Sequence, residues 1–236
     1  MPVNSGLAVT DVYCLVFKGT SLFAGTFGGV YVSGNYGASW SAGSFGIVYP
    51  VITSLGVGGT TLFAGTDGCG VYRTTNDGSS WTPVSAGFTN TDIWSFAASP
   101  GGSVFAGTPF GVVCSSDDGA TWSSMTFGIV NWSVRALAVS TYLGSTTILA
   151  GTDGGTYMST DNGVNWTPSW GASNVNALLS IPGDSLAQEP SVFAGTEDGR
   201  VIDPPGADLV KCSTSPGQVS SFDQQQFPHG GIGTRP

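Results

Sequence analysis

A segment of about forty residues recurs along this chain, and the recurrence restricts the folds that the chain can adopt. The tripeptide Ala-Gly-Thr occurs five times, each time after a short apolar run. Its copies begin at Ala24, Ala64, Ala106, Ala150 and Ala194. A fixed period of this length indicates a tandem array of one supersecondary unit rather than a single irregular domain.

Each repeat predicts four short β-strands. The apolar run is the first strand, the segment around Ala-Gly-Thr is the second, and a "GVY"-like segment is the third. A fourth strand follows a recurring tryptophan. The chain holds 37 glycines in 236 residues, and no stretch shows an uninterrupted helical period. Four strands in about forty residues match one blade of a β-propeller, so an all-β fold is expected.

A sharper motif, S/T-x-D/N-x-G-x-x-W, joins the expected third and fourth strands. Its four copies end at Trp40, Trp81, Trp122 and Trp166, and their third positions hold Asn35, Asn76, Asp117 and Asp161. The motif resembles the Asp box, or BNR repeat, of sialidase-type β-propellers, and the resemblance extends over roughly residues 1–203. It implies an architectural role: the Asp or Asn oxygen accepts backbone N–H groups across the turn, and the tryptophan anchors the hairpin in its own blade.

The two ends of the array suggest how the ring closes. "MPVNSGLAVTDVY" aligns with "TPVSAGFTNTDIW" at a constant offset, so the chain begins with a fourth strand that lacks a blade. We therefore expect a five-bladed propeller over residues 1–208, in which residues 2–7 complete the last blade, followed by a C-terminal tail, 209–236. The alternative is a fragment of a longer array.

Candidate ligand-binding residues lie where the repeats differ. One column of the first strands varies between regular neighbours and comprises Tyr13, Thr53, Trp94, Arg135 and Asn176. The turns between second and third strands, and the starts of the first strands, add acidic residues: Asp67, Asp92, Asp153, Glu197, Asp198 and Asp11. In a propeller these positions share one face around the channel mouth. Aromatic rings beside carboxylates suit a glycan or a protein partner. The alternative is a solvated acidic face with aromatic residues that plug the channel.

Composition narrows the partners. A formal net charge of −9 argues against nucleic acid and against anionic membrane surfaces. No run of eighteen apolar residues predicts a membrane span, and the first residues do not resemble a signal peptide. The four cysteines form no C-x-x-C pair and His229 is the single histidine, so neither a metal site nor a cofactor is expected.

The resemblance to sialidases also implies what an enzyme of that type would need: three convergent arginines, a tyrosine paired with a glutamate, and an aspartate acid. The chain has four arginines, Arg73, Arg135, Arg200 and Arg235, and their places in the repeat do not predict convergence. The leading interpretation is a non-catalytic binding or scaffold module, exported by a bacterium to the periplasm or the exterior. Alternatives are a glycoside hydrolase-like propeller, or a fragment of one, and a structural repeat without a ligand. The oligomeric state stays open.

Overall fold

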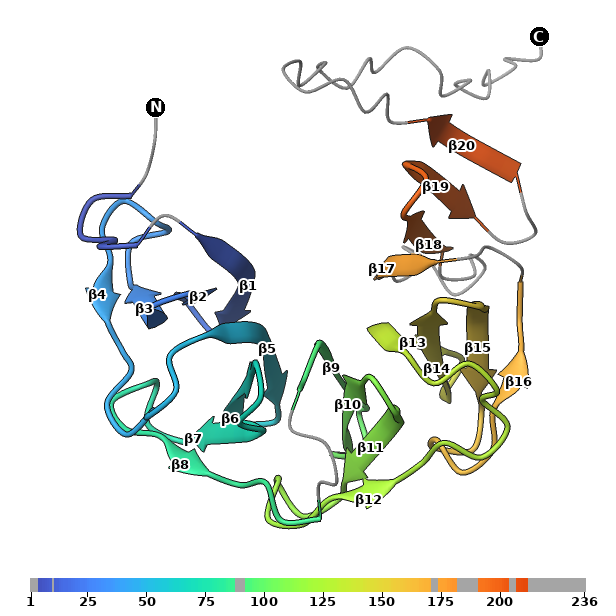
Figure 1. Ribbon diagram of the computed structural model, residues 1–236, viewed down its shortest axis with the longest axis horizontal. Coiled ribbons are helices and arrows are strands. Elements are labelled where there is room, and N and C mark those ends of the chain that lie inside the picture. Colours follow the sequence, from blue (N-terminus) through green and yellow to red (C-terminus); the bar gives the residue numbers. More distant parts are fainter. Residues whose placement is uncertain are drawn as a thin grey trace, which may run out of the picture.

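A computed structural model describes residues 4–9, 11–87, 92–170, 174–181, 191–203 and 207–211. These residues form five antiparallel sheets of four strands each, arranged side by side around an arc (Figure 1). Within each sheet the strands follow chain order, with the first strand at the inner edge of the arc and the fourth at the outer edge. The predicted all-β architecture of five four-stranded propeller blades is confirmed.

The strands are numbered in chain order, four to a blade. The first strands are β1 (Val12–Lys18), β5 (Ile52–Gly58), β9 (Ser95–Ala98), β13 (Val134–Tyr142) and β17 (Val175–Ile181). The second strands are β2 (Ser21–Thr26), β6 (Thr61–Thr66), β10 (Val104–Thr108), β14 (Ser145–Thr152) and β18 (Ser191–Thr196). The third strands are β3 (Gly29–Ser33), β7 (Val71–Thr74), β11 (Gly111–Ser115), β15 (Gly155–Ser159) and β19 (Arg200–Asp203). The fourth strands are β4 (Ser41–Ala42), β8 (Thr82–Pro83), β12 (Ser123–Ser124), β16 (Thr167–Pro168) and β20 (Ala207–Lys211).

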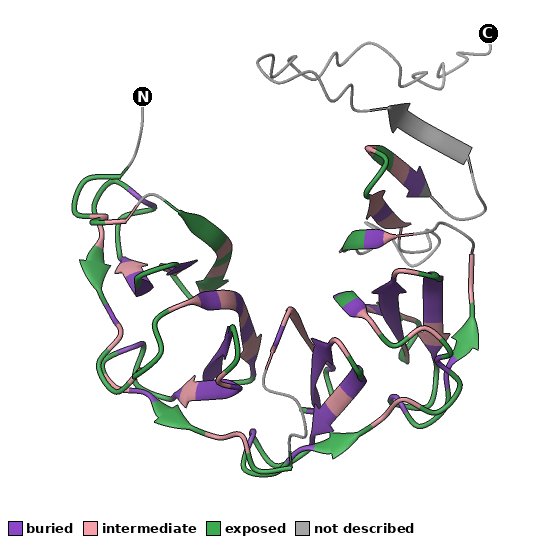
Figure 2. Cartoon of the chain, viewed as in Figure 1, coloured by how far each residue is buried: buried purple, intermediate pink, exposed green. Residues whose placement is uncertain are grey.

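The hydrophobic core lies between successive blades. Phe23 and Val30 of blade 1 share one buried cluster with Ile52 of blade 2, and the same arrangement recurs along the arc (Figure 2). The Ala-Gly-Thr glycine permits this close approach: a Cβ atom on Gly25 would lie 2.7 Å from Cγ2 of Ile52. Each blade is therefore stabilised mainly by its neighbours, as in other repeat proteins.

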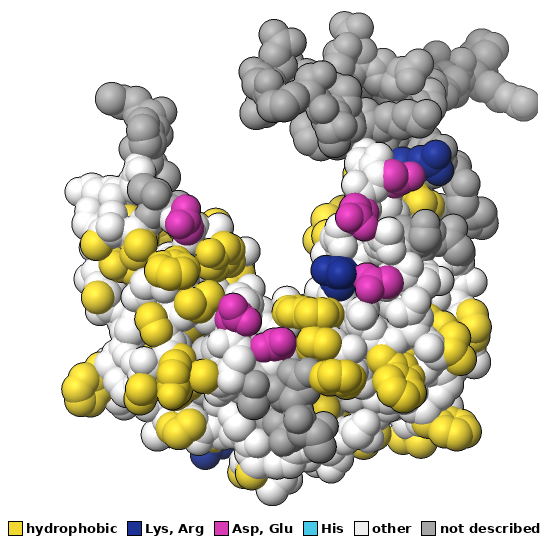
Figure 3. Space-filling view, viewed as in Figure 1, with side chains coloured by type: hydrophobic (Ala, Val, Ile, Leu, Met, Phe, Trp, Pro, Cys, Tyr) yellow, Lys and Arg dark blue, Asp and Glu magenta, His cyan; other side chains and the backbone are white. Residues whose placement is uncertain are grey.

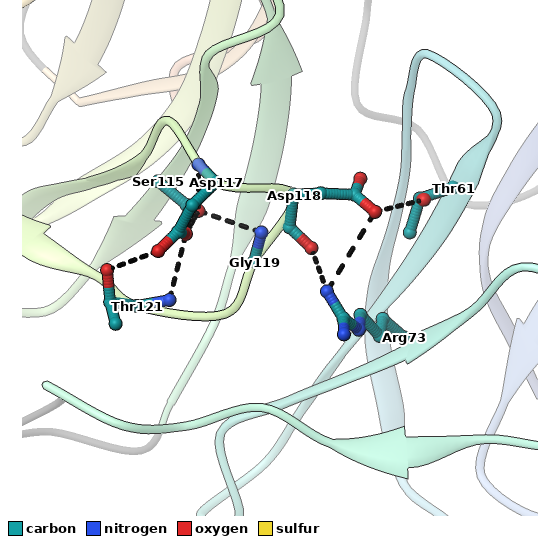
Figure 4. Close-up of polar contacts among 7 residues, drawn as sticks. All are labelled: Thr61, Arg73, Ser115, Asp117, Asp118, Gly119 and Thr121. Carbon is teal, nitrogen blue, oxygen red and sulfur yellow. Dashed lines mark hydrogen bonds and ion pairs between the residues drawn. The ribbon is translucent and has the colours of Figure 1, made fainter.

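The S/T-x-D/N-x-G-x-x-W turns are held by their own polar side chains (Figure 4). In blade 3 the Gly119 N–H donates to Ser115 Oγ at 2.8 Å, and the Thr121 N–H donates to Asp117 Oδ1 at 2.9 Å. Hydrogen bonds from Thr121 and Ser115 lower the pKa of Asp117 to about 2. Asn35, Asn76 and Asp161 accept the equivalent N–H bonds in their own turns.

These turns also reach the preceding blade. Asp118 Oδ2 accepts a hydrogen bond from the Thr61 hydroxyl at 2.9 Å and lies 3.8 Å from Nη1 of Arg73, which also donates to the Asp118 carbonyl (Figure 4). Asp77 pairs with Lys18 in the same way, one joint earlier along the arc. The turn thus fastens two blades together.

The tryptophans are placed differently from the prediction. Trp81 Nε1 donates to the Gly43 carbonyl at 2.6 Å, and Trp166 Nε1 donates to the Met125 carbonyl at 2.7 Å. Both acceptors belong to the preceding blade, so each ring joins two blades and does not serve its own blade alone. Trp81, Trp122 and Trp166 are each 3% exposed within clusters that join two blades, whereas Trp40 is half-buried.

The predicted ring closure is also wrong. Strand β20, rather than residues 2–7, pairs with β19 as the fourth strand of blade 5. Residues 2 and 3 lie outside the described residues, but the Ser5 carbonyl accepts the Trp40 N–H at 2.8 Å in blade 1. Phe45 and Trp81 make the equivalent bond at the next joint. A constant offset between repeats cannot say which blade the segment joins.

The described parts of blades 1 and 5 stand apart, so the arc is open between them (Figure 1). Blade 5 continues to Lys211 through β20. The rest of the predicted tail, 212–236, lies outside the described residues.

Candidate functional site

The variable column coincides with irregularities in the first strands. The pairing register with the second strand skips one residue between Val12 and Cys14, and the same skip recurs in blades 2, 4 and 5. The skipped residues are Tyr13, Thr53, Arg135 and Asn176. A β-bulge leaves its extra residue unpaired and re-aims its side chain. This gives a physical reason why the column varies between regular neighbours: these four residues have no partner in the ladder.

Trp94 occupies the same column one residue before β9, and its N–H donates to the Gly107 carbonyl at 2.9 Å. The guanidinium of Arg135, from the next blade, lies over its ring with Cζ 5.3 Å from the ring centroid. Arg135 Nε also donates to Asp153 Oδ1 at 2.6 Å, within the turn between β14 and β15. Two neighbouring blades thus build one cluster of ring, cation and carboxylate.

Electrostatics tighten this cluster. The hydrogen bond with Asp153 raises the pKa of Arg135, and the same bond lowers the pKa of Asp153. The charge of Glu197, from blade 5, acts on Arg135 in the same direction. The Arg135 and Asp153 side chains remain 45% and 33% exposed, so the pair lies at the surface, where a ligand can reach it.

The other predicted residues are placed less closely together. Asp92 Oδ1 accepts the Gly68 N–H at 2.7 Å, which ties blade 3 to the turn that contains Asp67. The Thr53 hydroxyl donates to the Ile93 carbonyl at 2.6 Å and so fastens a joint between blades. Tyr13 and Asn176 are exposed at the two ends of the column.

Acidic side chains predominate along the inner edge of the arc, which is open and concave in Figure 3. Arg135 is already paired with Asp153, and Arg200 lies 3.1 Å from Asp198 through its Nε. A hydrogen bond from the Thr196 hydroxyl lowers the pKa of Asp198. With the cations paired in this way, the surface favours a neutral or basic ligand.

Sequence reasoning missed a set of exposed apolar side chains in the loops that lead into two of the first strands. They come from two loops that lead from a fourth strand into the next first strand, with the related sequences "FGIVYP" and "FGIVNW". Phe45 is 79% exposed and Phe127 is 76% exposed, and the remaining members are Val48, Tyr49, Val130 and Trp132. The sequence contained a signal for this set, namely a run of apolar residues repeated in both loops. Only the isoleucine of each run packs into a core cluster between blades, and its apolar neighbours are left exposed.

Three arginines lie in the described part of the chain, and each has its own carboxylate partner. Arg73 faces the Asp118 turn at the periphery, while Arg135 and Arg200 each pair within their own blades, so these three arginines do not converge. Among the described side chains, no three His, Cys, Asp or Glu residues gather as metal ligands would. Over the same ranges, no helix has the length and apolar character needed to cross a bilayer.

Among known families, the profile described as the DUF6242 beta propeller domain matches residues 56–182. No curated protein matches the sequence.

Solved structures share the fold at low identity. An ancestral GH74 enzyme superposes with a TM-score of 0.67 at 18% identity, over 87% of this chain and 33% of the enzyme. The extracellular domain of a putative one component system from B. thetaiotaomicron gives 0.66 at 19%, over 82% of this chain and 26% of its own. A structure described as YCF48 bound to D1 peptide gives 0.59 at 14%, over 87% and 69%. This chain thus spans about a third or less of the first two proteins.

Proposed function

The chain belongs to the family described as the DUF6242 beta propeller domain, and from that premise we propose that it is a non-catalytic binding module. Its ligand face is the channel-mouth surface, defined by the bulge residues of the first strands, Trp94, and the turns that hold Asp153 and Glu197. The observation that carries the proposal is the cluster of Trp94, Arg135 and Asp153, built by two blades from positions outside the strand ladder.

The partner that this face suits best is a basic polypeptide segment. Its carboxylates outnumber its cations, and both described arginines nearby are already paired. The exposed aromatic and apolar loop residues, such as Phe45 and Phe127, add area of the kind enriched in protein interfaces. One structural neighbour is described with a bound peptide, which agrees with this use of the fold.

A neutral glycan is the second candidate, because the exposed Tyr13 and the half-buried Trp94 offer ring faces beside carboxylates. A glycoside hydrolase-like activity is a weaker alternative, since the described arginines do not form the clamp that a sialidase requires.

The same proposal assigns the four peripheral turns to the Asp-box type and gives them architecture rather than ligand binding. Their polar side chains form hydrogen bonds within the turn and to the preceding blade. Export to the periplasm or the exterior is proposed with it, supported by neighbours that are extracellular domains from B. thetaiotaomicron.

Fluorescence anisotropy with a panel of labelled peptides tests this function. Lysine- and arginine-rich peptides that contain aromatic residues should bind, and their affinity should fall with added salt. Trp94→Ala should weaken binding by about thirtyfold, as for a central hot spot. Arg135→Ala should strengthen binding of basic peptides, because it frees the Asp153 carboxylate. Val164→Ala, in an exposed peripheral turn, is the matched control and should change nothing.

Two further assays separate peptide binding from glycan binding and from glycoside hydrolysis. Salt-insensitive binding on a glycan array that depends on Trp94, without peptide binding, would replace the polypeptide with a sugar. Turnover of fluorogenic glycosides that Asp92→Asn abolishes would overturn the non-catalytic assignment. If neither peptides nor glycans bind, the proposed ligand face is wrong.

A further inference from the structure

Four equivalent joints connect the five blades, and one contact recurs at each. A β-branched residue at the start of a first strand packs on the Ala-Gly-Thr glycine of the preceding blade. A Cβ on Gly65 would lie 2.7 Å from Cβ of Ile93, and a Cβ on Gly151 would lie 2.5 Å from Cγ1 of Val175. The β-branched residues are fully buried: Ile52, Ile93, Val134 and Val175 are all 0% exposed.

Blade 5 presents the same glycine with no such neighbour among the described residues. A Cβ on Gly195 would meet only the Ala177 Cβ, at 3.5 Å, which belongs to its own blade. Leu179 and Ile181, on the same side of the sheet, are 57% and 46% exposed. Phe193 is only partly buried, whereas its counterparts Phe23, Phe63 and Phe105 are 0% exposed.

Blade 1 presents the complementary half of a joint. Val12, the counterpart of Ile52, is 38% exposed, and Leu15 and Phe17 on the same side of β1 are 59% and 55% exposed. Figure 2 shows β1 largely exposed, while β5 is buried at alternate residues. The backbone partner that a joint supplies to the tryptophan is already in place, because Ser5 bonds to Trp40.

The peripheral contacts of these two exposed faces can be compared with those of the internal joints. At the first three internal joints the fourth residue of the turn is polar and meets a polar group: Asp77 meets Lys18, Asp118 meets Thr61, and Asn162 meets Ser103. Blade 1 has Tyr36 at this position, 72% exposed, and its ring is tilted against that of Phe17 with 6.4 Å between the centroids. The position of Lys18 in blade 5 is Ile181, and the position of Thr61 and Ser103 in blade 5 is Ser191. Tyr36 carries both a ring and a hydroxyl, so it suits either position.

We propose that blade 1 of a second copy of this chain docks on blade 5 of the first, head to tail, and repeats the internal joint. Every copy carries both halves of the contact, so a second copy is a partner that is certain to present the matching face. Within one chain the arc holds the two faces apart (Figure 1), and their meeting would require the four buried joints to rearrange. The contact is heterologous, so it can extend beyond two copies. This surface borders the proposed ligand face at Tyr13 and Asn176 but uses different side chains.

Sedimentation velocity over a range of protein concentrations tests the proposal. The wild type should associate with rising concentration. Val12→Asp charges one face and Gly195→Leu fills the other, and each alone should weaken association by about thirtyfold or more. An equimolar mixture of the two variants should recover one joint and stop at the heterodimer, because each variant keeps the half that the other lacks. Val130→Asp, in an exposed loop, is the control and should associate like the wild type.

Circular dichroism establishes that each variant is folded, and Leu179→Asp replaces Gly195→Leu if the latter unfolds. A wild type that stays monomeric at all concentrations overturns the proposal in favour of closure within one chain or free faces. Association that survives both single substitutions, or that the mixture does not restore, overturns the head-to-tail geometry.

Discussion

Arg135 lies over the ring of Trp94, with the guanidinium carbon 5.3 Å from the ring centroid, although the two residues belong to neighbouring blades. A double-mutant cycle with Trp94→Ala and Arg135→Ala, measured by urea unfolding, should give a coupling of about 0.5–1 kcal/mol, as expected for an exposed cation–π contact. Tyr13→Ala combined with Arg135→Ala is the control and should be additive, because Tyr13 lies on blade 1. A coupling of zero between Trp94 and Arg135 would contradict the contact.

The Asp117 turn should give the protein a pH-dependent stability. The folded-state pKa is about 2, below the usual 3.8, so the carboxylate stabilises the fold above the unfolded-state pKa. This contribution falls as the pH drops from about 4 toward about 2. Asp117→Asn keeps an oxygen acceptor, as Asn35 shows by accepting the Ser39 N–H at 2.8 Å. Urea midpoints of the wild type and this variant should therefore differ at neutral pH and converge near pH 2.

The reciprocal variant, Asn76→Asp, places a carboxylate in the equivalent turn of blade 2. It should acquire the pH dependence that Asp117→Asn loses. Parallel midpoint profiles for all three proteins would show that the turn carboxylate contributes no linkage.

An Ala-Gly-Thr glycine should tolerate substitution by alanine only where no residue of a following blade packs against it. In Gly107→Ala the new Cβ would lie 2.6 Å from the Val134 carbonyl oxygen and 2.9 Å from its Cγ1. Backbone cannot yield as a side chain can, so we expect a loss of about 1–3 kcal/mol in unfolding free energy. Gly195→Ala meets only Ala177, at 3.5 Å, and should leave thermal and urea midpoints nearly unchanged. Equal losses in the two variants would rule out this account of the repeat.

The tryptophans should differ in how much each contributes to the free energy of unfolding, according to how deeply each is buried between two blades. Trp81 is 3% exposed and donates to Gly43 of the preceding blade, so Trp81→Ala should cost about 3–5 kcal/mol. Trp40 begins the array and is only half-buried, so Trp40→Ala should cost less. Urea unfolding followed by circular dichroism compares them, and a larger loss for Trp40 would argue against joint-centred packing.

Sequence periodicity was sufficient to predict the strands and the blades because each repeat carries its own turn and glycine signals. It also identified the variable column, since Tyr13, Arg135 and Asn176 stand between regular neighbours. The pairing of Arg135 with Trp94 and Asp153 could not be derived, because it depends on the angle between adjacent blades.

The closure was mispredicted for a related reason. Residues around Ser5 have the pattern of a segment that follows a fourth strand, and the structure places Ser5 beside Trp40 as such a segment should lie. Every blade presents an equivalent edge, so local pattern cannot distinguish one edge from another. The exposed loop residues Phe45 and Phe127 were overlooked because their apolar character looked like part of the strand pattern.

The recurring joint has an evolutionary consequence. Since Ile52 meets Gly25 as Ile93 meets Gly65, a gene duplication that inserts or deletes one whole unit would leave every surviving surface with a compatible neighbour. The bulge residues lie outside the strand ladder and could then diverge in each new copy, except where one bonds to a neighbouring blade as Thr53 does. Lengthening the array and acquiring new specificities would therefore be independent events in the history of such a gene.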